Sequence, residues 1–209
     1  MNIDKLIIRV VLNTLAAIAA MFVFLFSMLI IFFPSTMMNF TYKMGMDAAS
    51  ISYAKREYKR TDKIYYIAHA TETAIGLGDY EKIFSCGKAF IEDEDFATYC
   101  EAKNENRPSG AVGGYEQYIY GQVCVSEYAL GKKTEAVERA FGYIGKDFPS
   151  QNAVAAVLVN ALVKDDFATV ELIKGKMEKL QIVNLSENDK AYYADILELI
   201  ELEMGELTK

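Results

Sequence analysis

The sequence predicts an all-α protein in which one transmembrane helix near the N-terminus precedes a stack of antiparallel helix pairs. Three observations predict this class. Residues 10–33 carry no charge and, as a helix of about 36 Å, would cross a hydrocarbon core of about 30 Å. Beyond residue 45, apolar residues recur at intervals of three and four, which is the period of a helix. Glycines then separate successive apolar segments at regular distances along the chain.

Charge is distributed unevenly along the 209 residues. The net charge is −7, but residues 1–60 carry seven basic and three acidic side chains, whereas residues 61–209 carry 15 basic and 26 acidic ones. An acidic body offers no positive surface to a phosphate backbone, so the composition excludes a nucleic-acid-binding role. Three prolines and three cysteines are too few for a collagen-like or disulfide-rich protein.

The uncharged segment predicts an uncleaved membrane anchor, so we assign residues 1–34 to a cytoplasmic tip and this anchor. A cleaved signal peptide is the alternative, but its apolar region is about 7 to 15 residues long and ends at a site between small residues. The alanines between positions 16 and 20 come too early for such a site, and Pro34 follows the segment as a helix stop. The predicted partner of residues 10–33 is therefore the lipid bilayer.

The basic residues that flank the anchor favour an N-terminus in the cytoplasm and a body outside it. Lys5 and Arg9 precede the uncharged segment, and Lys43 follows it. A wider window adds the basic run at residues 55–60, which would place the body in the cytoplasm against anionic headgroups. At least one of the three cysteines is unpaired within a chain, which also favours a reducing compartment. These cysteines are Cys86, Cys100 and Cys124.

Residues 35–60 are expected to form a juxtamembrane segment and the first helix of the body. The segment contains apolar and aromatic side chains that suit a membrane interface or the docking of the anchor onto the body. We favour an aromatic belt at the interface. The side chains concerned are Met37, Met38, Phe40, Tyr42, Met44 and Met46.

The body, residues 61–209, is expected to consist of helices joined by glycine turns. Thr61 and Asp62 can cap a helix that ends at Gly76 and Gly78, and Asp79 can start its partner. The next pair is expected over residues 115–130 and from Gly131 to a stop at Pro149. Three further helices complete the body: residues 152–163, a helix opened by Asp165 and Asp166, and a last helix capped by Ser186.

The expected turns recur at a period typical of helical repeats. Gly45 and Gly78 are 33 residues apart, and Gly131 and Asp165 are 34 apart. The gap of 53 from Gly78 to Gly131 equals one period of 34 and an insertion of about 19 residues. A turn-rich stretch at about residues 101–114 is the expected insertion, which we interpret as a solvated connector in preference to a binding or gating loop.

At Leu77–Lys82 and at Leu130–Ala136 the chain resembles the turn and second-helix start of tetratricopeptide repeats. The resemblance covers residues 45–180. It implies a solenoid of helix pairs whose curved surface grips a peptide or a partner protein and performs no chemistry. Candidate contact residues are tyrosines on the first helices and one arginine of the insertion, because tyrosine and arginine are favoured in interfaces. They are Tyr65, Tyr66, Tyr118, Tyr120 and Arg107. The alternative, which we favour for any single tyrosine, is that it caps the edge of the core.

The sequence predicts no catalytic, cofactor-binding or metal-binding residue. His69 is the only histidine, and with Glu72 it provides too few ligands for a metal ion. The acidic run at residues 92–95 lacks the spacing of a calcium loop, and the glycines at 110–114 lack the Lys-Ser or Lys-Thr of a phosphate-binding loop.

The predicted function is that of a single-pass membrane protein whose helical-repeat body acts as a scaffold or adaptor for another protein. The alternative is an accessory subunit of a membrane transporter or enzyme complex. In that case Asn13, Thr14 and Ser27 would contact neighbouring helices within the bilayer.

Overall fold

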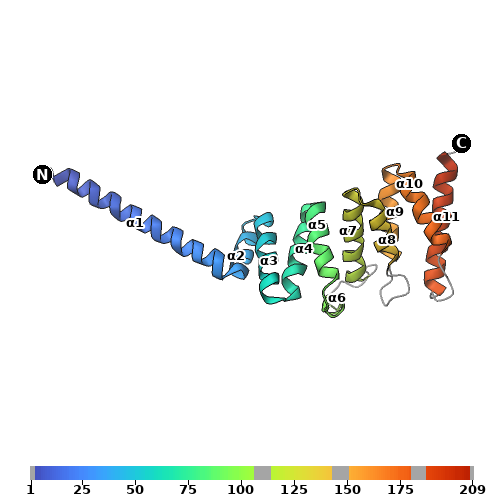
Figure 1. Cartoon of the computed structure of the whole chain (residues 1–209), viewed down its shortest axis with the longest axis horizontal. Helices are drawn as coiled ribbons and strands as arrows, with labels where there is room; N and C mark the ends of the chain where they lie inside the picture. The colour runs from blue at the N-terminus through green and yellow to red at the C-terminus, as the bar shows by residue number, and fades with distance from the viewer. Residues whose placement is uncertain (1–2, 106–113, 143–150, 180–186, 208–209) are drawn as a thin grey trace. The chain divides into compact units, whose positions relative to one another are not determined.

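The computed structural model describes residues 3–105, 114–142, 151–179 and 187–207 (Figure 1). Within these residues the structure contains eleven α-helices and no strand, which confirms the all-α prediction. The chain divides into two compact units, residues 1–66 and residues 67–209. Each unit is described by itself below.

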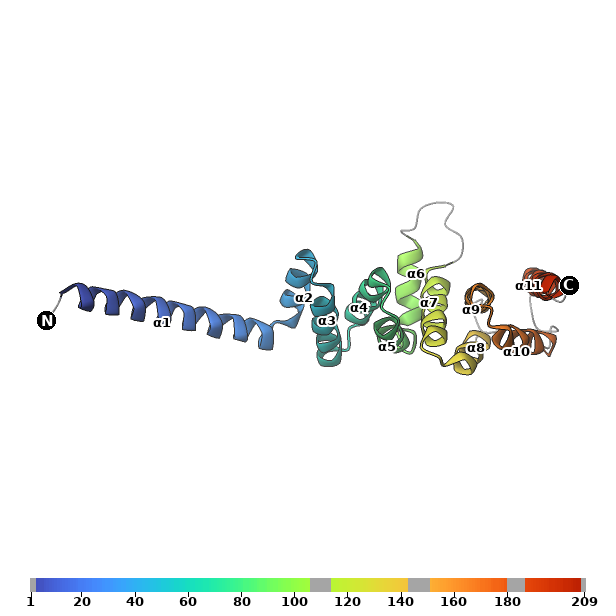
Figure 2. The ribbon, with the colours of Figure 1, turned by 90° about the horizontal axis from the view of Figure 1, so that it is seen from above.

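The first unit begins with the long helix α1 (Ile3–Phe32). Its segment Ile7–Phe32 is long and apolar enough to cross a membrane, and none of its most apolar part is buried by the rest of the protein. Pro34 is the first residue of α2 (Pro34–Lys43), a position where its missing N–H group costs no hydrogen bond. The prediction that Pro34 stops the helix is therefore correct for α1, but the chain re-enters a helix at once. Figures 1 and 2 show that α2 leaves the line of α1.

Helices α2 and α3 (Asp47–Thr61) form an antiparallel hairpin, so residues 35–60 contain two helices instead of the single one expected. Met37 and Met38 of α2 are buried, as are Ile51 and Ala54 of α3. The hydroxyl of Ser50 in α3 donates to the carbonyl oxygen of Met38 at 3.2 Å.

The expected cap at Thr61 and Asp62 was assigned to the wrong helix. Thr61 is the last residue of α3, and Asp62 follows it with a left-handed φ of 52° and donates its backbone N–H to the Tyr58 carbonyl at 2.7 Å. Asp tolerates both the N-cap and the left-handed conformation, so its presence between two apolar segments does not distinguish the end of one helix from the start of the next.

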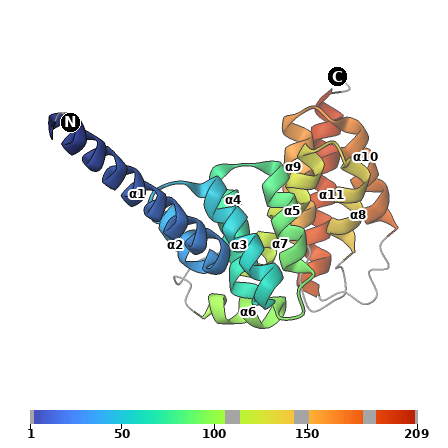
Figure 3. The same ribbon diagram turned by 60° about the vertical axis from the view of Figure 1, so that its left-hand side comes forward.

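The second unit contains the remaining helices, apart from the first three residues of α4, which belong to the first unit (Figure 3). Helix α7 packs against α5, α8 and α9, and the largest buried side chains include Ile83, Phe90, Ile119 and Leu158. The helices are α4 (Ile64–Leu77), α5 (Tyr80–Ile91), α6 (Phe96–Asn104), α7 (Tyr115–Ala129), α8 (Lys133–Phe141), α9 (Gln151–Val163), α10 (Phe167–Glu178) and α11 (Glu187–Leu207).

Four hairpins, α2–α3, α4–α5, α7–α8 and α9–α10, share one turn geometry. The turn residues that the sequence predicted all have a left-handed φ: Gly45 at 68°, Gly78 at 65°, Gly131 at 82° and Asp165 at 53°. In each turn the N–H of the following residue donates to the carbonyl oxygen five residues earlier, as in a Schellman motif. These bonds are Met46 to Thr41, Asp79 to Ala74, Lys132 to Glu127 and Asp166 to Ala161, at 2.8, 3.3, 3.2 and 2.9 Å.

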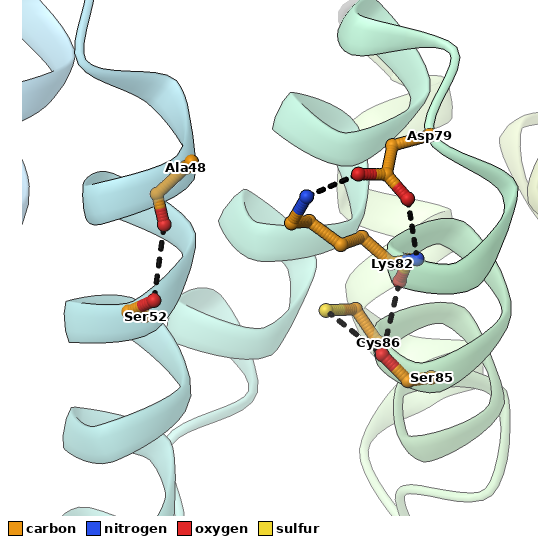
Figure 4. Close-up of polar contacts among 6 residues, drawn as sticks. All are labelled: Ala48, Ser52, Asp79, Lys82, Ser85 and Cys86. Atoms are coloured by element: carbon orange, nitrogen blue, oxygen red, sulfur yellow. Dashed lines mark hydrogen bonds and ion pairs between the residues drawn. The ribbon is translucent and has the colours of Figure 1, made fainter.

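Asp79 and Asp166 cap the helices that they were predicted to open. The Asp79 carboxylate accepts the backbone N–H of Lys82 at 3.1 Å and also pairs with the Lys82 ammonium group (Figure 4). The backbone N–H of Thr169 donates to Asp166 at 3.4 Å. A cap of this kind satisfies one of the N–H groups that the first turn of a helix leaves unpaired.

Two predicted boundaries differ from the structure. Residues 101–104 belong to α6, so the expected insertion at 101–114 begins with a helical turn, and residues 106–113, including Arg107, lie outside the described residues. Helix α8 ends at Phe141 instead of continuing toward Pro149. Residues 143–150 and the expected cap Ser186 also lie outside the described residues.

Candidate functional site

The predicted contact tyrosines belong to both units and differ in exposure. Tyr65 is about half exposed and lies edge-to-face with the half-buried Tyr66, with ring centroids 5.5 Å apart, in the first unit. Tyr118 is also about half exposed, but it lies on α7 in the second unit. Tyr120 is only 5% exposed, and its ring packs edge-to-face on Phe96. The expectation that Tyr120 contacts a partner is therefore wrong, because this side chain belongs to the core.

A polar cluster joins α4, α6 and α7 in the second unit. We call it the clamp; its members are Glu72, Lys103, Asn104, Tyr115 and Glu116. One carboxylate oxygen of Glu72 accepts both the Tyr115 hydroxyl at 2.6 Å and the Lys103 ammonium at 3.0 Å. The Asn104 side chain accepts the backbone N–H of Tyr115 at 2.7 Å and donates to Glu116 at 2.7 Å. The clamp thereby ties the last residue of α6 to the first residue of α7.

Two aromatic rings lie beside the Lys103 ammonium group of the clamp. The Lys103 ammonium lies 5.5 Å from the ring centroids of both Tyr99 and Tyr115, within the range of cation–π attraction. Partial burial lowers the pKa of Lys103, but its bond to Glu72 outweighs that effect and the pKa is raised. Burial, reinforced by the bond to Glu72, raises the pKa of Tyr115 far above its usual range. Lys103 is therefore charged at neutral pH, and the Tyr115 hydroxyl keeps its proton as a donor.

A second polar cluster, which we call the junction, joins α7, α8 and α10 through Asp166. One oxygen of this carboxylate accepts from Tyr128 at 2.9 Å, from Lys133 at 2.7 Å and from the Thr169 hydroxyl at 2.8 Å. Burial pushes the pKa of Asp166 upward, but the donors Lys133, Thr169 and Tyr128 outweigh it and hold the pKa at about 2. Burial and the bond to Asp166 raise the pKa of Tyr128 to about 12.

The buried carboxylate of Glu127 pairs with Arg139 across the α7–α8 hairpin, near the junction. The Arg139 Nε lies 2.7 Å from Glu127, whose side chain is almost completely buried. The hydrogen bond to Glu127 raises the pKa of Arg139 more than desolvation lowers it. A buried charge without a partner is costly, so Arg139 of α8 compensates the burial of Glu127 of α7.

The described cysteines are unsuited to nucleophilic chemistry. Cys86, Cys100 and Cys124 are all buried, and each is present as a reduced thiol. Burial raises the pKa of Cys100 and of Cys124 to about 12, so both keep their protons at neutral pH. Among the described residues, no group of three or more His, Cys, Asp or Glu side chains is arranged to hold a metal ion.

The residues predicted to flank the membrane lie on the first two helices. Lys5 and Arg9 belong to α1, and Lys43 is the last residue of α2. The basic run at residues 55–60 is partly engaged within the protein. Arg56 donates to the carbonyl oxygens of Ile30 and Ile31, at 3.2 and 3.4 Å, and Arg60 pairs with the buried Glu57 at 2.5 Å.

Two hydroxyls of α1 bond within their own helix. Thr14 donates to the Val10 carbonyl at 2.9 Å, and Ser27 donates to the Val23 carbonyl at 2.8 Å. These bonds satisfy both donors without a neighbouring helix, so Thr14 and Ser27 can face lipid without an unpaired hydroxyl proton.

The clamp and the junction are not predicted by the sequence. Glu72 and Tyr115 are 43 residues apart, and Tyr128 and Asp166 are 38 apart, so neither pairing follows from a local pattern. The one available signal for the clamp was the position of Asn104 and Tyr115 on either side of the turn-rich stretch.

Comparison with known proteins identifies no relative of this chain. No family model matches the chain, and neither the search of curated proteins nor the search of solved structures finds a match.

Proposed function

We propose that this chain is a single-pass membrane protein whose hairpin-built body binds another protein and performs no chemistry itself. The observation that carries the proposal is the fourfold recurrence of one Schellman turn after an N-terminal helix long enough to span a bilayer. Proteins built from repeated helix pairs typically use the extended surface of the stack for binding.

The packing within the second unit supports a repeat-like stack of the tetratricopeptide kind. The first helix of one hairpin, α7, packs against the second helix of the preceding hairpin, α5, and against the first helix of the next, α9. Such nearest-neighbour packing is how a solenoid buries a continuous core. Helix α6 and the residues that follow it form the insertion between the second and third hairpins.

The proposed binding surface includes the exposed side chains of first helices. Tyr118 on α7 and Val159 on α9 are each about half exposed, although α7 and α9 pack together. Tyrosine combines a large contact area with a polar tip, and exposed apolar side chains on a repeat mark a surface that a partner can cover.

Site-specific photo-crosslinking in native membranes tests the proposal. A benzoylphenylalanine residue replaces Tyr118 on α7 or, as a matched control, Glu135, which is exposed on the second helix α8. We expect a discrete adduct of higher mass from position 118 and none from position 135. No adduct at position 118, or the same adducts at both positions, would contradict the proposed surface.

We infer that the body lies outside the cytoplasm, because Lys5 and Arg9 precede the span and only Lys43 closely follows it. The pairing of Arg60 with Glu57 and the bonds from Arg56 to α1 support this inference, because they reduce the number of cations in the 55–60 run that are available to anionic headgroups. Proteinase K added to sealed cells should digest a C-terminally tagged body. Protection of the body until the cells are opened would place it in the cytoplasm.

A further inference from the structure

We propose that the tip of the α2–α3 hairpin is a second membrane contact, which inserts into the boundary between headgroups and acyl chains of the bilayer that α1 crosses. The tip consists of Phe40, Tyr42, Lys43, Met44 and Met46. The inference rests on the proposed role of α1 as an anchor. It adds a lipid-binding surface outside the transmembrane segment.

The α2–α3 hairpin separates the apolar stretch after the anchor into two sets. Met37 and Met38 are almost completely buried in the hairpin. The four apolar or aromatic side chains of the tip are all half exposed or more, although they lie within ten residues of that core. Exposed apolar side chains gathered at one turn are unfavourable in water, and they mark a surface with another environment.

Comparison of the four equivalent turns shows that the first is unusual. The residue after the left-handed position is Met46 in the first turn, but Asp79, Lys132 and Asp166 in the others. Asp79 and Asp166 accept hydrogen bonds from the first turns of α5 and α10, whereas a methionine side chain cannot cap α3 in this way. The first hairpin therefore has an exposed apolar residue where the same backbone geometry elsewhere holds a charged one.

The location of the tip identifies lipid as its partner. One residue, Phe33, separates α1 from α2, and α2 is about 15 Å long, so the tip stays within one short helix of the point where α1 ends. Figures 1 and 2 show α2 at an angle to the axis of α1. The chain therefore does not run straight on from the end of the anchor, which would carry the tip directly away from the bilayer. Arg56 holds this bend by bonding from α3 to the last turn of α1.

The composition of the tip matches the interfacial layer of a bilayer. Tyrosine, phenylalanine and methionine fit the acyl boundary, and the Lys43 ammonium can extend to the phosphate groups. Asn39 is exposed beside the tip, and Asp47 is half-buried just after it. These polar groups restrict insertion to the depth of the headgroups and the first acyl carbons.

Tryptophan fluorescence can test the proposal because the chain contains no tryptophan. The full chain is reconstituted into phosphatidylcholine–phosphatidylglycerol vesicles whose acyl chains carry bromine either near the glycerol or near the bilayer centre. Met44→Trp reports on the tip. Leu77→Trp is the matched control, because Leu77 is exposed and directly precedes the left-handed residue of the second turn. Phe22→Trp reports on the anchor.

We expect bromine near the glycerol to reduce the emission of Met44→Trp by about twofold or more, as for a group inserted 5–10 Å into the boundary. Bromine at the bilayer centre should quench Phe22→Trp most strongly, and Leu77→Trp should remain unquenched. Adding Met46→Asp, which introduces the capping residue found in the second and fourth turns, should reduce the quenching of Met44→Trp. Far-UV circular dichroism of each variant should match that of the unmodified chain.

Two results would overturn the proposal. The first would contradict only the lipid contact of the tip, and the second would also contradict the membrane anchor. If Phe22→Trp is quenched but Met44→Trp is quenched no more than Leu77→Trp, the anchor stands and the tip does not contact lipid. If that unquenched Met44→Trp emission also shifts to the blue with protein concentration, a second copy covers the tip instead. If Phe22→Trp is not quenched, both the anchor and the lipid contact of the tip are wrong.

Discussion

Gly87 determines how closely two helices of the second unit approach each other. A Cβ atom at this position would lie 2.5 Å from the Cγ2 atom of Val123, a distance that side-chain carbons do not tolerate. The valine methyl belongs to a short branched side chain on α7, so it cannot swing away as the end of a lysine could. The absence of a side chain at position 87 therefore allows α5 to pack against α7.

Gly87→Ala should lower the free energy of unfolding by about 1–3 kcal/mol, because overpacking outweighs the gain in helix propensity. Gly175→Ala in α10 is the matched control. Nothing lies within 4 Å of the added Cβ there, so this variant should be more stable by about 0.5–1 kcal/mol. Urea titrations of the detergent-solubilised chain, followed by far-UV circular dichroism, measure both. Equal effects of the two substitutions would show that α5 and α7 do not pack this closely.

At the scale of elements, the sequence predicted the helices and their turns better than the contacts between them. Glycine at positions 45, 78 and 131 is informative because few other residues adopt a left-handed φ without strain. Asp165 is predicted as a turn residue only because it lies 34 residues after Gly131. Its residue type is less informative, because Asp adopts a left-handed φ less readily than Gly does. The pairing of Glu72 with Tyr115 depends on how α4, α6 and α7 pack, and no local pattern in the sequence encodes that arrangement.

The burial of Tyr120 illustrates the same limit. Tyr118 and Tyr120 are two residues apart on α7, so their side chains point in different directions from the helix axis. Because α7 packs against neighbouring helices on several sides, only one of the two faces solvent. Both side chains are tyrosines, so the residue type does not distinguish the buried one from the exposed one. The neighbours α5, α6, α8 and α9 determine which of the two is buried.

The junction makes a prediction about pH, because its carboxylate has a pKa of about 2 in the folded chain and about 3.9 when unfolded. A lowered pKa means that Asp166 stabilises the fold fully above pH 5, and that this contribution is lost as the pH falls toward 2. Asp166→Asn should therefore lower the unfolding free energy at pH 7 by on the order of 1–2 kcal/mol. The difference from the unmodified chain should shrink below pH 5.

Asp165→Asn is the control for this prediction. Asp165 is exposed and has a left-handed φ, which Asn also tolerates, so its replacement should change stability by less than about 0.5 kcal/mol. Urea titrations at pH 7, 5 and 3 measure both variants. A difference for Asp166→Asn that stays constant across this range would mean that the carboxylate charge does not hold α7, α8 and α10 together.

At the scale of the whole molecule, the N-terminal part of the chain differs from the rest in charge and in hydropathy. The first 60 residues have an excess of basic side chains and include the one described helix that is apolar and long enough to span a membrane. The remaining residues carry a net negative charge, and their described helices bury apolar side chains such as Ile83, Phe90 and Ile119. The partner-binding proposal and the lipid contact of the tip both require the N-terminal helix to remain attached to the body.

The intact mass of the chain recovered from carbonate-washed membranes tests this requirement most directly. A C-terminal tag allows purification in detergent without selecting for the N-terminus. If α1 is an uncleaved anchor, we expect a membrane-bound product with the mass of the 209 residues and the tag. A product that lacks the residues up to about Pro34 would show that α1 is a cleaved signal peptide. A full-length product found only in the carbonate wash would show that α1 does not anchor the chain, and either result would contradict the proposed anchor.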